Sequence, residues 1–167
     1  MDFGACVCKP MAPLCHECPF NADCYAYTND QVQELPVKAK KQKLRSRYFY
    51  FLILHFGKKK AVRLRTKKDI WQDLYEFPLI ETEKATNLRE ILSLAENNQW
   101  IKKGEYEMIS ISRTYKQLLS HQKLEGQFIE LVLTEKPING DWNWVTPALM
   151  KKLAFPRFIN AYLADPK

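Results

Sequence analysis

The sequence has no apolar segment that approaches the length needed to span a bilayer, and no N-terminal charged region followed by an apolar run and a cleavage site. It also has no internal repeat and no low-complexity tract. These absences argue against a membrane-spanning protein, a secretory leader and a repeat array, and they predict a soluble intracellular protein. The 167 residues have room for one ordinary domain with an appendage, but for no second large domain.

An acidic excess is missing as well. The chain has 26 Lys and Arg against 19 Asp and Glu, which gives a net charge of +7. Much of the excess lies in residues 30–47, which have no sustained apolar period and contain Lys38, Lys40, Lys41 and Lys43. Concentrated positive charge favours an acidic polymer as partner. We therefore predict a basic linker that follows a phosphate backbone, although composition alone equally allows a solvated tether.

Cysteine is concentrated near the N-terminus. Cys8, Cys15, Cys18 and Cys24 are separated by six, two and five residues. Two thiolates that flank two residues can close on one metal centre, and the outer pair reach it from short loops. Structural zinc sites usually repeat the close pair or add histidine, so this spacing favours an iron-sulfur cluster, with zinc or free thiols as alternatives. The fifth cysteine, Cys6, is expected to be a small buried residue.

The rest of the chain predicts an α+β fold. Residues 48–55 and 61–66 are expected to form a hairpin, with Arg63 and Arg65 on its polar face as part of a basic surface. Residues 87–96 have helical apolar spacing, with Thr86 as the expected N-cap. Further strands are predicted at residues 79–80, 106–119, 127–134 and 142–144, and closing helices at residues 147–153 and 156–163. This order predicts a mixed β-sheet sandwiched by helices.

The cysteine spacing resembles the iron-sulfur loop of the endonuclease III and MutY branch of the helix-hairpin-helix DNA glycosylases. A cysteine loop, basic linker and α+β domain in this order are similar to the C-terminal part of MutY-type adenine DNA glycosylases, where a Nudix-like domain follows the cluster. Leu35–Lys38, Leu74–Pro78 and Leu119–His121 fall in that family's order. The resemblance implies a 4Fe-4S cluster on the four cysteines. It also implies three parts: a cluster loop at residues 1–29, a linker at 30–47 and a Nudix-like lesion-recognition domain at 48–167.

The resemblance also assigns a lesion-binding loop. Leu119, Ser120 and His121 match the family's Phe-Ser-His loop, with leucine in place of phenylalanine. 8-Oxoguanine differs from guanine by a carbonyl and a hydrogen on N7, and a serine hydroxyl, as donor and acceptor, can read both. The implied partner is double-stranded DNA with 8-oxoguanine:adenine or guanine:adenine mispairs, bound by a monomer. From the residues alone, Ser120 and His121 are more simply ordinary turn residues.

Two kinds of catalysis are not expected of this chain. Of the Nudix metal-binding box only Glu81, Arg89, Glu90 and Ile91 remain, while Tyr75 takes the glycine place and Ser93 and Leu94 take the places of adjacent glutamates. We therefore expect no pyrophosphohydrolase activity. The glycosylase family's catalytic glutamate and aspartate lie upstream of the cluster, before Met1, so we expect no adenine excision. The alternatives are a zinc-stabilised nucleic-acid adaptor without lesion preference and a stand-alone Nudix hydrolase of oxidised nucleotides.

Overall fold

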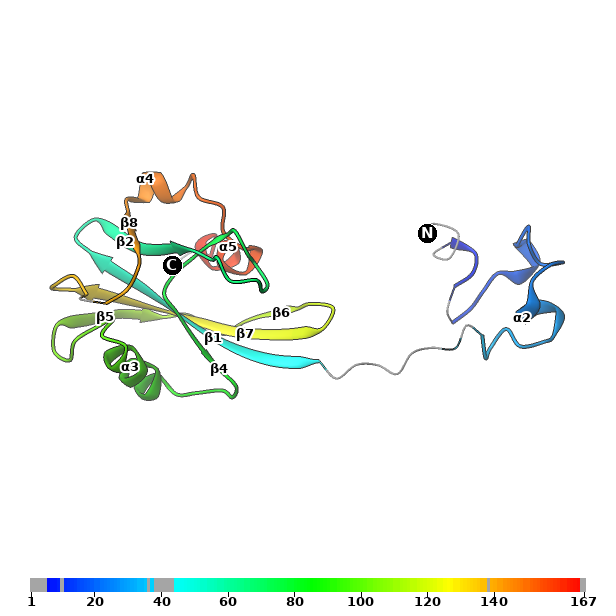
Figure 1. The fold of residues 1–167 in the computed structure, drawn as a ribbon, viewed down its shortest axis with the longest axis horizontal. Coiled ribbons are helices and arrows are strands. Elements are labelled where there is room, and N and C mark those ends of the chain that lie inside the picture. The colour runs from blue at the N-terminus through cyan, green and yellow to red at the C-terminus, as the bar shows by residue number, and fades with distance from the viewer. Residues whose placement is uncertain (1–5, 10, 36, 38–43, 138, 166–167) are drawn as a thin grey trace. The chain divides into compact units, whose positions relative to one another are not determined.

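The chain divides into two compact units, residues 1–42 and 43–167. The structure is a computed structural model that describes residues 6–9, 11–35, 37, 44–137 and 139–165 (Figure 1). The four linker lysines, Lys38, Lys40, Lys41 and Lys43, lie outside the described residues. No helix in the described ranges is long and apolar enough to cross a membrane.

The described part of the first unit includes turns and the short helices η1 (Cys15–Glu17) and α2 (Tyr25–Thr28). None of its described residues is buried. The Leu14 backbone N–H donates to the Val7 carbonyl over 2.9 Å and closes one loop of the cysteine-rich segment. Cys6 is exposed, so the expectation that it is a buried apolar residue is wrong; the described residues of this unit form no buried core that could receive it.

The second unit is built on a mixed sheet of eight strands whose centre is β1 (Figure 1). Strand β1 pairs in parallel with β7, from Arg45 opposite Gln122 to His55 opposite Val132. On the other side of β1, β4 pairs with its first half and β2 with its end. The strands are β1 (Arg45–Phe56), β2 (Lys59–Leu64), β3 (Tyr75–Glu76), β4 (Leu79–Thr82), β5 (Tyr106–Ile111), β6 (Tyr115–Leu118), β7 (Gln122–Leu133) and β8 (Asn143–Val145).

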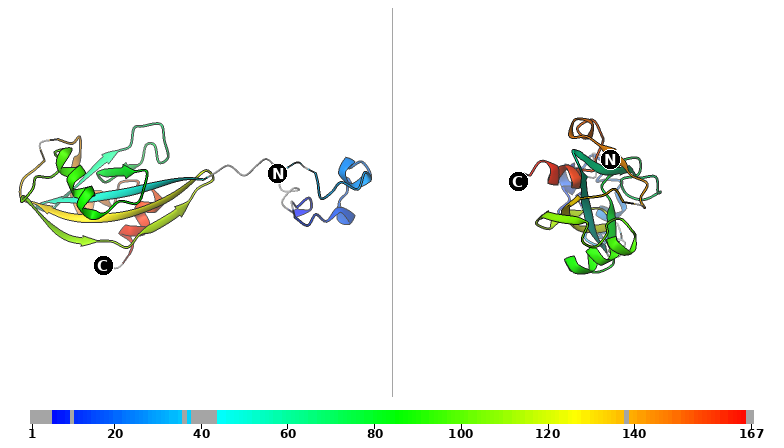
Figure 2. Two further views of the ribbon diagram at one scale, coloured as in Figure 1. Left: turned by 90° about the horizontal axis from the view of Figure 1, so that it is seen from below. Right: turned by 90° about the vertical axis from the view of Figure 1, so that its left-hand side faces the viewer.

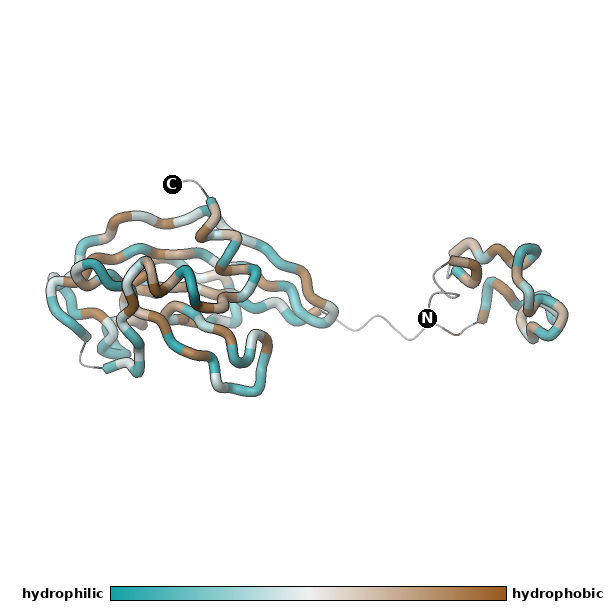
Figure 3. The backbone as a smooth tube through the Cα atoms, turned by 90° about the horizontal axis from the view of Figure 1, so that it is seen from above, coloured by the Kyte–Doolittle hydropathy of each residue, from teal (hydrophilic) through white to brown (hydrophobic). Residues whose placement is uncertain are grey.

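Both faces of the sheet are buried. The helices are α3 (Leu88–Asn97), α4 (Pro147–Met150) and α5 (Arg157–Leu163), and Figure 2 shows α3 and α5 with the sheet between them. Alternate residues of β1 feed two cores, so Phe51 packs with residues of α5 and Leu52 packs with residues of α3. A strand buried on both faces needs a continuous apolar run, which explains the sequence Phe49–Leu54. Figure 3 shows hydrophobic and hydrophilic segments alternating along this domain.

Helix α5 packs directly on the sheet at a glycine of β7. A Cβ atom on Gly126 would lie 2.8 Å from the Phe49 carbonyl oxygen and 3.0 Å from the Phe158 ring. The Phe49 oxygen belongs to the backbone of the central strand and cannot move without shifting it, and the Phe158 ring is packed in the core. Gly126 is therefore required by this close packing.

Three details of the predicted elements are corrected. Asn87, and not Thr86, caps α3, because its side chain accepts a hydrogen bond from the Glu90 N–H at 2.9 Å. The expected strand over residues 106–119 is two strands, β5 and β6, separated where Ser112 bonds to Phe128 through both its N–H and its hydroxyl. Helix α4 ends at Met150, earlier than the predicted residue 153.

Candidate nucleic-acid interface

The predicted lesion loop is the tight turn between β6 and β7. The Leu119 N–H donates to the Gln122 carbonyl at 2.8 Å and closes the turn. Ser120 and His121 are exposed at its tip. The His121 carbonyl accepts from the Arg45 N–H at 3.2 Å, which joins the turn to the first residue of β1. The sequence places the lysine-rich linker directly before this point.

The two leucines of the turn have different environments. Leu119 is half-buried and packs against the core beneath α5, whereas Leu118 is 69% exposed. Strand alternation explains the difference, since Leu119 shares a face with Tyr115 and Gln117. Sequence comparison with a Phe-Ser-His loop selects position 119, but the apolar side chain that solvent reaches at this turn belongs to Leu118.

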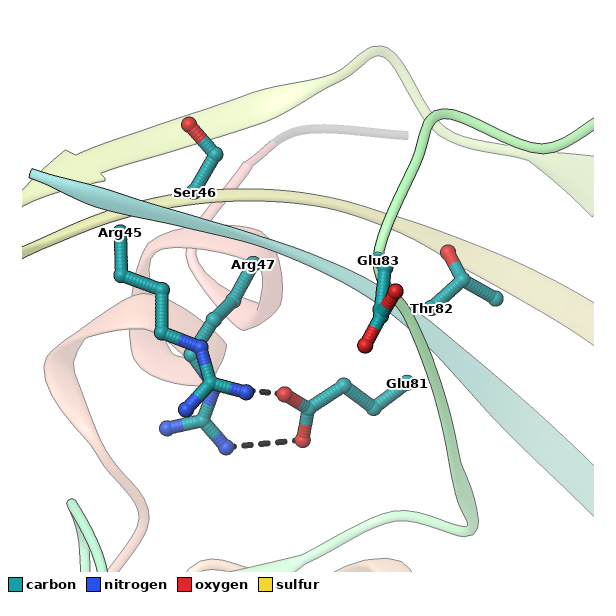
Figure 4. Close-up of a pocket in the computed structure, with 6 residues that line it drawn as sticks. All are labelled: Arg45, Ser46, Arg47, Glu81, Thr82 and Glu83. Carbon is teal, nitrogen blue, oxygen red and sulfur yellow. Dashed lines mark hydrogen bonds and ion pairs between the residues drawn. The ribbon is translucent and has the colours of Figure 1, made fainter.

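Arg45 and Arg47, which were assigned to the linker, are the first and third residues of β1. Together with Glu81 they line a cavity of about 520 Å³ (Figure 4). Only 7% of Arg47 is exposed. Its Nε and one Nη donate to the two oxygens of Glu81 at 2.6 and 2.7 Å, and its two Nη atoms donate to Asp69 at 3.0 and 2.7 Å. Arg47 is therefore an internal cation with matched carboxylates.

A second arginine extends this network. Arg65 is 9% exposed and donates to Glu76 at 2.6 Å and to Asp69 at 2.8 Å. Glu76 is 1% exposed and also accepts from Arg63 at 2.9 Å. The expectation that Arg65 belongs to a basic surface is wrong, because a buried carboxylate such as Glu76 needs cationic partners. Hydrogen bonds from Arg47, followed by weaker ones from the Ile70 backbone and Arg65, outweigh burial and hold the pKa of Asp69 well below its usual range.

The four predicted metal ligands line one small, mainly apolar cavity of about 30 Å³. Its other walls come from Val7, Pro13, Leu14, Asn21 and Tyr27, and Cys6 does not line it. Burial, followed by repulsion from the other three cysteines, raises the pKa of Cys15. Across the described part of the chain, no group of three or more His, Cys, Asp or Glu residues is arranged to hold a metal ion. The donor set itself, four thiols around an apolar cavity, is chemically suited to a sulfur-ligated centre.

Comparison with known proteins agrees with this fold. The NUDIX domain family matches residues 49–165. The chain belongs to the NUDIX domain family. An adenine DNA glycosylase of Buchnera aphidicola subsp. Schizaphis graminum is 28% identical over 120 residues, which cover 72% of this chain and 30% of the relative. A second, from Buchnera aphidicola subsp. Acyrthosiphon pisum, is 27% identical over 84 residues, covering 50% of this chain and 24% of the relative. The chain thus spans less than a third of these curated relatives.

Two solved structures share the NUDIX fold. The C-terminal domain of mouse MUTYH, in complex with human PCNA, aligns with a TM-score of 0.55 and 16% identity over 70% of this chain and 84% of that one. The Nudix hydrolase RenU from M. smegmatis aligns with a TM-score of 0.52 and 11% identity over 72% of this chain and 84% of that one. The predicted Nudix-like α+β fold and the resemblance to the C-terminal part of MutY-type glycosylases are confirmed.

The remnants of the NUDIX metal box do not converge on a cation site. Arg89 and Glu90 are exposed on α3, as expected of ordinary surface charges. Glu81 lies on β4 and binds Arg47, and Ser93 supplies no carboxylate. The internal arginine and carboxylate network was missed from the sequence, because its members come from strands and loops far apart in the chain. The one available signal was the Leu74–Pro78 segment, which places a lone glutamate among residues that form a buried strand.

Proposed function

We propose that this chain is the lesion-recognition part of an adenine DNA glycosylase and binds duplex DNA that contains 8-oxoguanine opposite adenine. The curated relatives are adenine DNA glycosylases, and 120 residues of this chain align with the first of them. The observation that carries the proposal is the exposed Ser120, presented at the tip of a turn that backbone hydrogen bonds fix on both sides. A fixed turn holds a reading side chain in position without an ordering cost on binding.

The chemistry of the turn fits the lesion. The Ser120 hydroxyl donates to the added carbonyl of 8-oxoguanine or accepts from its N7 hydrogen, whereas guanine offers neither group. His121, beside it, contacts a backbone phosphate. Leu119 supports the turn from within the core, and Leu118 supplies the exposed apolar surface. Duplexes with guanine:adenine mispairs should bind more weakly, because they lack the groups that Ser120 contacts.

The N-terminal unit supplies a sulfur-ligated centre in this proposal. Cys8, Cys15, Cys18 and Cys24 would hold a 4Fe-4S cluster, whose role is to fix the shape of a loop that otherwise has no buried core. Lys38, Lys40, Lys41 and Lys43 would then contact the phosphate backbone. Excision of adenine is assigned to residues outside this chain, so the chain alone releases no adenine from an 8-oxoguanine:adenine duplex.

The test is the lesion preference of a Ser120→Ala variant. Binding to duplexes that differ only in 8-oxoguanine or guanine opposite adenine is measured by fluorescence anisotropy. In Ser120→Ala, the preference for 8-oxoguanine over guanine should be about 1–3 kcal/mol smaller than in the wild type, which is the usual discrimination of a good base-edge contact. Ser93→Ala removes another exposed hydroxyl, on α3, and should leave the preference unchanged.

Two results would contradict the proposal. One is a wild-type chain that binds both duplexes equally, which is the behaviour of an adaptor without lesion preference. The other is an equal change in preference for Ser120→Ala and Ser93→Ala, which would separate the preference from the turn. Magnesium-dependent release of phosphate from an oxidised nucleotide would instead support a Nudix hydrolase.

A further inference from the structure

We infer that the groove between the free edge of β6 and helix α5 is a second DNA-contact surface, which receives the phosphate backbone beside the Ser120 turn. The inference rests on the proposed function and adds the residues that would hold the duplex while the turn reads the base. The proposed function gives this groove no role, because it uses only the cysteine loop, the basic linker and the turn.

The groove has two walls of different kinds. Strand β6 pairs only with β7 among the described strands, so its other edge is free. The residues Tyr115–Leu118 of this strand and Arg157, Phe158 and Ala161 of α5 line a cavity of about 400 Å³. Leu118 is followed directly by the turn at residues 119–121. A ligand in the groove therefore continues onto the exposed Ser120.

The carboxylates close to the groove are already neutralised. Asp165 accepts from Arg113 at 3.0 Å and from the Tyr115 hydroxyl at 2.5 Å. Glu125 on β7 is paired with Lys123 at 2.7 Å. Asp165 and Glu125 are thus each paired with a cation. An incoming anion is therefore not met by unbalanced negative charge.

Two cations of the groove remain available. Lys116 and Arg157 are exposed, and neither forms an ion pair with another described residue. Lys116 stands opposite Glu125 on β7 and attracts it electrostatically without forming an ion pair, because Glu125 is ion-paired with Lys123.

Lys116 alternates with Tyr115 and Gln117 and therefore extends from the face of β6 that turns away from α5, whereas Arg157 belongs to α5 itself. Two positive charges thus flank the free edge of β6, unlike the cavity at Arg47, where carboxylates match the guanidinium. This charge favours a phosphate backbone over an apolar or basic occupant.

The walls of the groove are held by the core. Phe158 is 3% exposed and packs onto β7 at Gly126, where no larger residue fits. Tyr115 is fixed on the other side by its contacts with Phe128 and Tyr162. The two cations therefore extend from an ordered frame, and their removal changes charge without removing core packing.

The experiment compares two double variants of the full chain. Lys116→Gln/Arg157→Gln removes two charges at the groove, and Lys58→Gln/Lys59→Gln removes two exposed charges near the β1–β2 turn, at the other end of β1. Binding to 8-oxoguanine:adenine and guanine:adenine duplexes is measured from 50 to 200 mM salt. Each lost phosphate contact reduces the slope of log K against log[salt] by about 0.9. The ratio of the wild-type binding constant to that of the groove variant should therefore shrink about tenfold across this range. The loss should be equal for both duplexes.

The outcomes separate this inference from the proposed function. A groove variant that binds like the Lys58→Gln/Lys59→Gln control, while Ser120→Ala still loses lesion preference, overturns the groove and leaves the lesion reader standing. A groove variant that binds more weakly than the control, while Ser120→Ala keeps the lesion preference, supports the groove and contradicts lesion reading. Wild type that binds neither duplex overturns both. Binding of a polyglutamate peptide that Lys116→Gln/Arg157→Gln abolishes, without any effect on DNA, assigns the groove to an acidic protein and contradicts the inference.

Discussion

The two units of this chain are held together in different ways. The NUDIX unit buries two apolar clusters, one on each face of its sheet, and its internal arginines are matched by carboxylates. The described residues of the cysteine-rich unit include no buried side chain, and its order comes from short backbone hydrogen bonds around four thiols. A segment this small has too little apolar surface to fold without a crosslink or a metal centre. One unit thus carries its own stability, while under the proposed function the other depends on what its cysteines bind.

The largest test of this difference is Cys18→Ser. If the four thiols hold a cluster, loss of one ligand should abolish the order of residues 6–35, because binding of the metal centre is the folding energy of such a segment. Amide hydrogen exchange at Leu14, whose N–H is bonded to Val7, should then accelerate by a factor on the order of ten or more, while exchange within β1 and β7 stays as in the wild type.

Cys6→Ser is the matched control, since Cys6 is exposed and does not line the cavity. Iron content measured on the same samples should fall for Cys18→Ser only. Slow exchange at Leu14 in the iron-free Cys18→Ser protein would show that the first unit is stable by itself, and the contrast between the units would be lost.

The NUDIX unit should respond to pH through Asp69. The folded pKa of Asp69 lies below its unfolded value, so its ion pairs stabilise the fold above about pH 4 and lose this effect as pH falls further. At pH 7, Asp69→Asn should cost about 2 kcal/mol, because it leaves Arg47 and Arg65 without one shared carboxylate.

Urea unfolding at several pH values measures this effect. The difference between wild type and Asp69→Asn should narrow as pH falls below about 4. Asp23 lies in the other unit, so Asp23→Asn supplies a control for the lost charge. If the difference in unfolding free energy between wild type and Asp69→Asn stays constant down to about pH 2, Asp69 does not contribute to the pH dependence of the domain.

The sequence predicted the central strands well because their signal is local, whereas the four cysteine ligands stay a prediction. The apolar run at Phe49–Leu54 is long enough to indicate a strand buried on both faces, and the spacing of cysteines needs no tertiary information. Arg47 is different. Its partners Asp69 and Glu81 are 22 and 34 residues away, and only the register of β1 with β4 brings Glu81 to it. Composition alone therefore placed a buried arginine among the exposed cations of the linker.

The close approach of Phe49 and Phe158 to Gly126 could not be predicted from the sequence either. Its neighbours are Phe49 on β1 and Phe158 on α5, which are far from it in sequence. In the candidate site, the turn was found because three successive residues resemble a known loop. The inward direction of Leu119 and the exposure of Leu118 depend on the strand boundary, which sequence patterns fix only to within a few residues.

The smallest expected effect concerns the cap of α3. Thr86 and Asn87 are both good N-cap residues, and the structure assigns the bond to Asn87, whose side chain accepts from the Glu90 N–H. Asn87→Ala should destabilise the NUDIX unit by about 1 kcal/mol, while Thr86→Ala should cost less, because the Thr86 hydroxyl bonds only to the exposed Lys84 carbonyl. Both are measured by urea unfolding, with exchange at Leu14 as the readout of the other unit. Equal losses for the two variants would mean that the hydroxyl shares the capping role, whereas any change at Leu14 would mean that the units do not fold independently.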